Sequence, residues 1–169
     1  MDDTLAHLVP QPARRVITAR SEYVAAFDEL VPHVRRELRI FDPDLAQLEL
    51  DSPGRVERLR RFLTANRDNR LYIAVHDPDH LTRSMPRMMD LLTQLGTNIA
   101  VHRTVGDAAR VQDCFVLVDA EHVIRRAVAA HPRGVVLTDD QKEAHAMRER
   151  FDEIWQSSVP AVSATKLGL

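Results

Sequence analysis

Hydrophobic residues recur every three or four positions in four segments of the chain, which is the period of an amphipathic helix. These segments cover residues 21–38, 53–65, 79–95 and 140–157. Ser52 and Pro53 suit the N-cap and first turn of the second segment, and Gly96 suits the C-cap of the third. Pro32 falls inside the first segment, where it predicts an interruption.

Short apolar runs without that period lie between the helical segments and predict β-strands. They cover residues 16–18, 38–43, 71–75, 98–102, 114–119, 122–128 and 134–137. Strands and helices alternate at first, and strands then follow one another directly. This order predicts an α/β fold, with a mixed β-sheet and helices on both faces. We assign residues 1–13 to an N-terminal arm, 14–157 to one domain and 158–169 to a C-terminal tail.

Composition narrows the class of protein. A chain of 169 residues with 44% hydrophobic and 28% charged residues has room for one globular core, and it contains no apolar run long enough to span a bilayer. We therefore expect no membrane association. The acidic start, Met1-Asp2-Asp3, is unlike a secretory signal, and Cys114 is the only cysteine. These features predict a cytoplasmic protein.

Charge gives little support for a nucleic-acid partner, because the formal net charge is only −2. One arginine-rich helix face is the exception; it consists of Arg55, Arg58, Arg60 and Arg61, followed by Arg67 and Arg70. A solvated face paired with Glu57 and Asp68 is the favoured interpretation. Nucleic-acid binding stays open as an alternative, although the aromatic residues that single-stranded binders interleave with arginine are missing there.

The closing helix ends in Phe151-Asp152-Glu153-Ile154-Trp155. With this ending and its order of strands and helices, the chain resembles one half of the phospholipase D superfamily over residues 14–157. It also resembles an uncharacterised bacterial family with a degenerate phospholipase D-like region, some members of which follow an acetyltransferase domain. Lys166-Leu167-Gly168-Leu169 fits that pattern.

The superfamily motif is His-x-Lys-x4-Asp. In this chain Asp119 keeps the motif's Asp position, while Gln112 stands in place of the His and Cys114 in place of the Lys. The Gly-Ser pair that follows the motif in the superfamily is also missing. A glutamine amide is a much weaker nucleophile than imidazole, and it does not gain or lose a proton near neutral pH. The resemblance therefore implies the fold without phosphodiesterase activity by that route.

Other polar residues form candidate sites. His102, Arg103, His122, Arg125 and Arg126 lie near predicted strand ends and are candidate anion-binding residues, with a solvated rim as the alternative. Another group, His76, Asp77, Asp79 and His80, has metal-ligand chemistry, but no cysteine or further spaced histidine completes a known pattern. A polar turn that caps the next helix is favoured there, so we expect no metal and no cofactor.

Three functions follow from these observations. The leading hypothesis is a non-catalytic phospholipase D-like domain, or pseudoenzyme, with a regulatory, ligand-sensing or protein-interaction role. Its expected partners are a second copy of the chain, another protein or a small anionic ligand. The first alternative is an enzyme with a remodelled site near Asp119 and His122 that acts on a phosphate-containing substrate. The second is a nucleic-acid-binding accessory protein.

Overall fold

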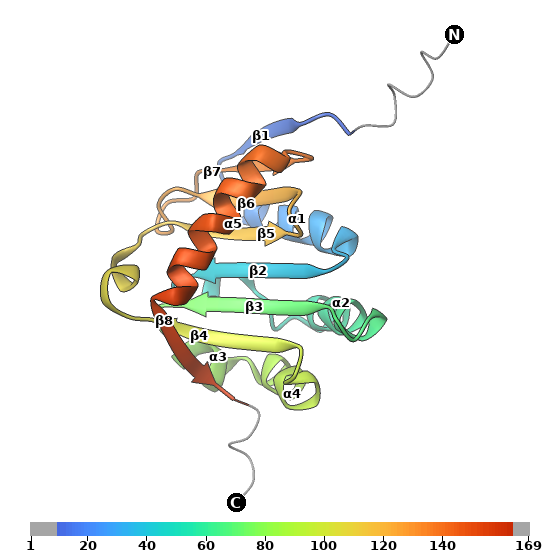
Figure 1. Cartoon of the computed structure of the whole chain (residues 1–169), viewed down its shortest axis with the longest axis vertical. Helices are drawn as coiled ribbons and strands as arrows, with labels where there is room; N and C mark the ends of the chain where they lie inside the picture. The colour runs from blue at the N-terminus through green and yellow to red at the C-terminus, as the bar shows by residue number, and fades with distance from the viewer. Residues whose placement is uncertain (1–9, 164–169) are drawn as a thin grey trace, which may run out of the picture.

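An eight-stranded mixed β-sheet runs through the centre of the protein, with strand order β1-β7-β6-β5-β2-β3-β4-β8 (Figure 1). The computed structural model describes residues 10–163. The strands are β1 (Ala13–Ile17), β2 (Glu37–Asp42), β3 (Arg70–Val75), β4 (Ile99–Thr104), β5 (Cys114–Val118), β6 (His122–Arg126), β7 (Gly134–Thr138) and β8 (Ser158–Val162). The mixed sheet, with helices on both faces, confirms the predicted fold class.

Strand direction gives the sheet two distinct ends. β2, β3 and β4 are parallel, whereas β5 pairs antiparallel with β2 and β6 antiparallel with β5. The carboxyl ends of β2, β3 and β4 therefore meet the start of β5 and the end of β6 at one end of the sheet, the motif end. The opposite end holds the start of β2, the β5–β6 turn and the end of β7.

Helices cover the two faces unequally. On one face lie α1 (Arg20–Leu30), α2 (Pro53–Ala65), α3 (Asp79–Ser84) and α4 (Pro86–Leu95), and α5 (Gln141–Gln156) crosses the other face (Figure 1). Short 3-10 turns occur at Val31–His33, Ala46–Leu48 and Gly106–Arg110. In the part of the chain that the structure describes, no helix has the length and apolar character needed to cross a membrane.

Two prolines explain where the predicted helices are shortened. α1 ends at Leu30, and Pro32 lies in the 3-10 turn that follows. The segment predicted as one helix over 79–95 is split into α3 and α4, because Pro86 disfavours helical geometry at Met85. The N-cap prediction holds at α2, where the Ser52 hydroxyl accepts a hydrogen bond from the Arg55 amide.

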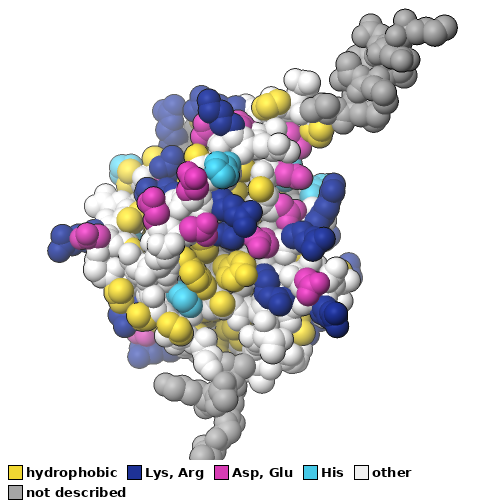
Figure 2. Space-filling view, viewed as in Figure 1, with side chains coloured by type: hydrophobic (Ala, Val, Ile, Leu, Met, Phe, Trp, Pro, Cys, Tyr) yellow, Lys and Arg dark blue, Asp and Glu magenta, His cyan; other side chains and the backbone are white. Residues whose placement is uncertain are grey.

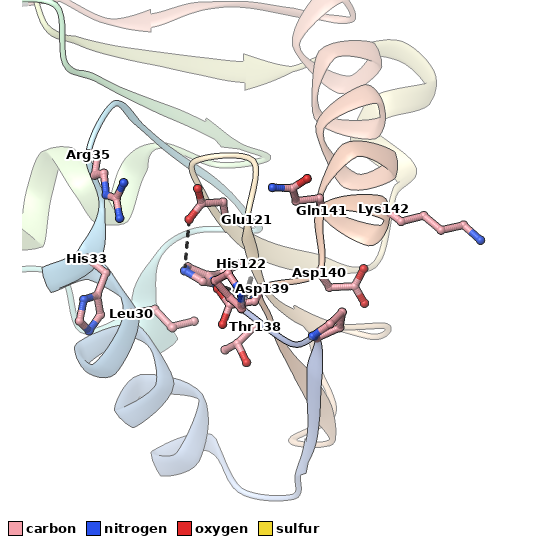
Figure 3. Close-up of a pocket in the computed structure, with 12 residues that line it drawn as sticks. Leu30, His33, Arg35, Glu121, His122, Thr138, Asp139, Asp140, Gln141 and Lys142 are labelled. Carbon is pink, nitrogen blue, oxygen red and sulfur yellow. Dashed lines mark hydrogen bonds and ion pairs between the residues drawn. The ribbon is translucent and has the colours of Figure 1, made fainter. Parts of the chain in front are cut away.

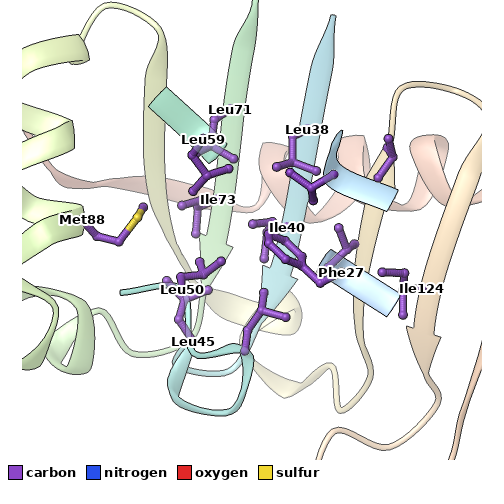
Figure 4. Close-up of a cluster of buried hydrophobic side chains, with 14 of the residues drawn as sticks. Phe27, Leu38, Ile40, Leu45, Leu50, Leu59, Leu71, Ile73, Met88 and Ile124 are labelled. Atoms are coloured by element: carbon purple, nitrogen blue, oxygen red, sulfur yellow. The ribbon is translucent and has the colours of Figure 1, made fainter. Parts of the chain in front are cut away.

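The hydrophobic core has two layers, one on each side of the sheet. The larger layer fills the space between the sheet and helices α1 to α4, and Figure 4 shows Phe27, Leu38, Ile40, Leu71 and Ile73 among its members. The smaller layer lies under α5 and includes Phe41, Phe115 and Phe151. Phe151 is buried as its helical phase predicts, whereas Trp155 is only partly buried.

The C-terminal edge strand was missed by the sequence analysis. β8 lies in the segment assigned to the tail, and it pairs antiparallel with β4. Pro160 and a register shift opposite Val101 and His102 make its pairing irregular, so hydrophobic alternation gives little signal there. Residues 1–9 of the predicted arm and 164–169 of the predicted tail, with Lys166-Leu167-Gly168-Leu169, lie outside the described residues.

Candidate functional site

The three positions of the degenerate motif are spread along β5. Gln112 is exposed just before the strand, Cys114 is fully buried at its first position, and Asp119 follows its last residue. Seven steps of about 3.3 Å place Gln112 and Asp119 roughly 23 Å apart, at opposite ends of the sheet. A second copy of the chain that meets the first beside Gln112 would therefore not bring Asp119 to the same two-fold axis.

The Asp119 side chain has a structural role, because it binds backbone amides of a neighbouring strand. Its two carboxylate oxygens accept hydrogen bonds from the backbone amides of Arg35, Arg36 and Glu37, at 3.0, 2.9 and 3.0 Å. The Asp119 amide in turn donates to the Glu37 carbonyl oxygen at 2.9 Å. The carboxylate thus fixes the start of β2 to the end of β5, and three donors already occupy its oxygens.

Cys114 belongs to a buried polar cluster, the Cys114–Arg126 cluster, formed by Tyr23, Gln47, Cys114 and Arg126. Cys114 and Arg126 are cross-strand partners, and the Arg126 Nε donates to the Cys114 Sγ at 3.4 Å. Arg126 Nη2 donates to the Gln47 Oε1 at 2.6 Å, and its guanidinium lies 4.7 Å from the centre of the Tyr23 ring. Burial raises the pKa of both the Cys114 thiol and the Tyr23 phenol. The site where the family's lysine would stand is therefore filled, with a neutral thiol beside a buried cation.

Asp42 is a second buried carboxyl group at the motif end. It is 2% exposed, and burial raises its pKa. The amides of Asp44 and Leu45 oppose this effect by donating to its Oδ1 at 3.1 and 2.8 Å, and the charge of Arg126 opposes it too.

The five candidate anion-binding residues do not surround one pocket. His102 and Arg103 lie on β4, and three strands separate β4 from β6, which carries the others. Arg125 and Arg126 are consecutive and face opposite sides of the sheet: Arg126 joins the buried cluster, while Arg125 pairs with Asp113 at 3.2 Å. His122 lies at the opposite end.

Asp113 is a buried carboxylate with two arginine partners, and the sequence pattern did not predict this role. Its side chain is 3% exposed and accepts hydrogen bonds from Arg125 and from the Nε and Nη2 of Arg150, at 3.1 and 2.8 Å. It thereby joins α5 to the sheet next to Gln112. A charged residue at the start of an apolar strand was the available signal.

Arg39 was missed in the same way, although it is the lone charge within Leu38–Phe41. It is 8% exposed, and it pairs with Asp152 at 2.6 Å and with Glu37 at 3.0 Å. Its guanidinium lies over the Tyr72 and Phe151 rings, 5.4 and 5.3 Å from their centres. Arg39 thus holds the C-terminal half of α5 on the sheet.

The histidine-aspartate group after β3 forms a turn, as favoured. His76 Nε2 donates to the Val111 carbonyl oxygen at 2.7 Å, so its Nδ1 accepts from the Thr104 hydroxyl at 2.5 Å. Asp77 accepts from the Asp79 amide at 2.9 Å at the start of α3. Both ring nitrogens of His76 are therefore used inside the fold.

A cavity of about 900 Å³ opens at the opposite end of the sheet, and we call it the β6–β7 pocket (Figure 3). Leu30, His33 and Arg35 form one wall, and the other wall holds Glu121, His122 and Asp139. Asp119 is not among its lining residues. Asp119 and His122 therefore do not converge on one cavity, which removes the geometric basis for a remodelled enzyme site built from both.

His122, Glu121 and Asp139 have ligand atoms within 4.8 Å of one another, close enough to suggest a metal site. The hydrogen bonds argue against it. The Asp139 amide donates to His122 Nδ1 at 3.0 Å, so a neutral imidazole carries its proton on Nε2. That nitrogen, 3.8 Å from the Glu121 carboxylate, is a donor and has no lone pair for a cation.

Three of the six arginines of the arginine-rich face at α2 are paired with carboxylates. Arg55 forms two 2.8 Å hydrogen bonds with Asp28, and both Arg60 and Arg61 lie within 3.6 Å of the Glu57 carboxylate. The favoured interpretation, a solvated face paired with Glu57 and Asp68, is correct for Glu57, whereas Asp68 forms no ion pair with any described residue.

Comparison with known proteins gives a family and a fold. The family model described as Domain of unknown function (DUF7931) matches residues 19–167. No curated protein matches the sequence significantly.

Solved structures are similar at low sequence identity. TrmBL2, an archaeal chromatin protein described with a novel mode of DNA binding, has a TM-score of 0.65 and 12% identity; the match covers 94% of this chain but only 59% of TrmBL2. Nuc from Salmonella typhimurium, a phospholipase D family member, has a TM-score of 0.61 and 14% identity, over 90% of this chain and 100% of Nuc. Phosphatidylserine synthase from Haemophilus influenzae has a TM-score of 0.60 and 14% identity, over 94% of this chain and 41% of the synthase. These likenesses establish a phospholipase D-like fold.

Proposed function

Since the chain belongs to the DUF7931 family of domains of unknown function, and since its fold is phospholipase D-like, we propose that it is a non-catalytic regulatory or interaction module. One observation carries the proposal. At the motif end, a neutral amide stands at Gln112, and the buried Cys114 thiol is enclosed by Arg126 and Tyr23. The amide is not a nucleophile, and the buried thiol with its raised pKa supplies neither a thiolate to attack phosphorus nor a positive charge to hold a phosphate oxygen.

The Asp119 contacts support the same proposal. The motif's aspartate stays because it joins β5 to β2, a role that a protein without catalysis still requires.

A phosphodiesterase assay tests the proposal directly. With bis(p-nitrophenyl) phosphate as substrate, we expect no turnover above the buffer rate. Turnover that disappears in Gln112→Ala but persists in Gln11→Ala, a control at an exposed glutamine outside the motif, would overturn it.

We further propose that the module pairs with a second copy of itself across the face that carries α5. α5 is the only described helix on that face, and Figure 2 shows hydrophobic side chains gathered in a hollow near its centre. Tyr72 and Trp155 are partly buried, have ring centres 5.6 Å apart and line a small cavity together with Phe151. An isologous contact would bury the same patch on each copy.

Sedimentation velocity between about 10 and 200 μM tests this dimer, since a specific interface should bury more than about 1,000 Å². In the proposed dimer the two-fold axis passes beside the motif end of the α5 face, so the two copies of Gln112 lie near each other. Gln112→Glu should then weaken association by like-charge repulsion, and Gln11→Glu should not. A monomer over the whole range contradicts the dimer. A dimer that survives Gln112→Glu but dissociates in Arg58→Glu contradicts its proposed geometry.

Nucleic-acid binding is a second candidate, favoured by the DNA-binding description of TrmBL2. The exposed Arg58 and Arg67 side chains form no ion pair with any described residue. We expect at most weak binding of duplex DNA, lost between 50 and about 200 mM salt. Tight binding that Arg58→Gln with Arg61→Gln abolishes would favour this candidate over the interaction module.

A further inference from the structure

The β6–β7 pocket carries opposite charges on its two walls. Figure 3 shows the Arg35 and His33 side chains on one side, facing Glu121 and Asp139 across the cavity, while Lys142 extends away from it. Arg35 is exposed, and its guanidinium forms no hydrogen bond or ion pair with any residue from 10 to 163. An unpaired guanidinium is well suited to bind a carboxylate.

On the opposite wall Lys142 is the only cationic lining residue among those described, and its side chain extends away from the cavity. Glu121 and Asp139 each have a carboxylate oxygen within 4.8 Å of the other's and of a His122 ring nitrogen. The imidazole carries no net charge while its Nδ1 accepts the hydrogen bond from the Asp139 amide. Two carboxylates so close together repel unless a positive group lies between them. An ammonium group suits this position better than a metal, because it supplies hydrogens to both carboxylates and needs no lone pair from imidazole.

The backbone holds these groups in place before any ligand binds. The Asp140 amide donates to the Glu121 carbonyl oxygen at 3.0 Å, and with the Asp139–His122 bond it ties the β7–α5 loop to the β5–β6 turn. Asp139 has φ of +54°, a left-handed conformation that orients its side chain without a glycine. The Arg35 wall is fixed by the bond from its amide to Asp119.

From this arrangement we propose that the β6–β7 pocket binds an α-amino acid, with its carboxylate on Arg35 and its ammonium group between Glu121 and Asp139. A simple anion would leave the two carboxylates unpaired, and a simple cation would leave Arg35 unpaired. The cavity of about 900 Å³ has room for a side chain as well. This inference goes beyond the proposed function and does not depend on the loss of catalysis at the motif end.

Isothermal titration calorimetry with the full chain and each of the common L-amino acids at millimolar concentration tests the proposal. At least one should bind. Its amide, which lacks the carboxylate, and its N-acetyl derivative, which lacks the ammonium group, should each bind at least tenfold more weakly. Arg35→Gln and Asp139→Asn should reduce affinity at least tenfold with unchanged melting temperature; Asn tolerates the left-handed conformation. Lys142→Gln is the matched control and should change affinity less than twofold.

Several results would overturn the proposal. No heat with any amino acid would do so, as would equal binding of the amide and N-acetyl forms. Zinc or manganese that raises the melting temperature of the wild type, but not of His122→Ala, would assign the pocket to a metal instead.

Discussion

Replacing Asp119 is the sharpest test of how this fold uses the surviving motif residue. Asp119→Ala removes three acceptor contacts to the amides of Arg35, Arg36 and Glu37. The first two amides are in an exposed segment and regain water, so we assign about 0.5–1 kcal/mol to each, and about 1–2 kcal/mol to the partly buried Glu37 amide. Asp119 also has φ of +53°, where alanine costs about 1 kcal/mol more than Asp. The expected destabilisation is about 3–5 kcal/mol.

Two further substitutions separate the hydrogen bonds from the backbone. Asp119→Gly loses the same contacts without the left-handed penalty, so it should be about 1 kcal/mol more stable than the alanine variant. Asp119→Asn keeps its Oδ1 for Arg36 and Glu37 and turns an amide toward Arg35, so it should lose only about 1–2 kcal/mol.

Urea unfolding, followed by circular dichroism with unchanged m-values, measures these differences. Asp139→Ala is a matched control, since Asp139 has nearly the same φ, +54°, while its carboxylate bonds to no described residue. An Asp119→Ala variant no less stable than Asp139→Ala would refute the structural role that we assign to the motif aspartate.

Three other substitutions test the packing and the titrating groups. Phe151→Ala should cost about 3–5 kcal/mol in urea unfolding, and Trp155→Ala less, because Trp155 is only partly buried; the reverse order would contradict the helix phase. Asp42→Asn keeps an oxygen for both amide bonds and removes a buried charge, so its melting temperature at pH 7 should equal or exceed the wild type. Burial raises the folded-state pKa of Asp42, so any gain should vanish as the pH falls toward the unfolded pKa, about 3.8; a gain that persists there would contradict this cause. Burial lowers the pKa of His102, so wild-type stability should decline slightly as the pH falls below about 6.5, and this decline should be absent in His102→Gln.

Periodicity predicted most of the elements because each of them buries one apolar face or run. Val116 and Val118 in β5, for example, are fully buried, as a continuous apolar strand requires. The pattern does not predict the elements correctly where a proline or an irregular edge strand occurs. Pro86 divides a segment that was predicted as one helix, and Pro160 interrupts the alternation that would have predicted β8.

The sites were harder to predict because they depend on register between distant segments. Arg126 belongs with Cys114 only once β5 and β6 are paired, so the sequence indicated a free anion ligand where the structure has a buried partner. The β6–β7 pocket joins Arg35 to Asp139 across a hundred positions of sequence, and no local spacing signals that meeting.

The Cys114–Arg126 cluster also bears on how this sequence can change. A lysine introduced at position 114 would place a second cation beside Arg126 in a buried site, and two like charges about 4 Å apart repel by about 4 kcal/mol at an effective dielectric constant of 20. Restoring a histidine at the exposed position 112 meets no such obstacle. The two positions are therefore epistatically unequal. The cost of a lysine at position 114 depends on Arg126 and falls if Arg126 changes as well, whereas position 112 can change alone.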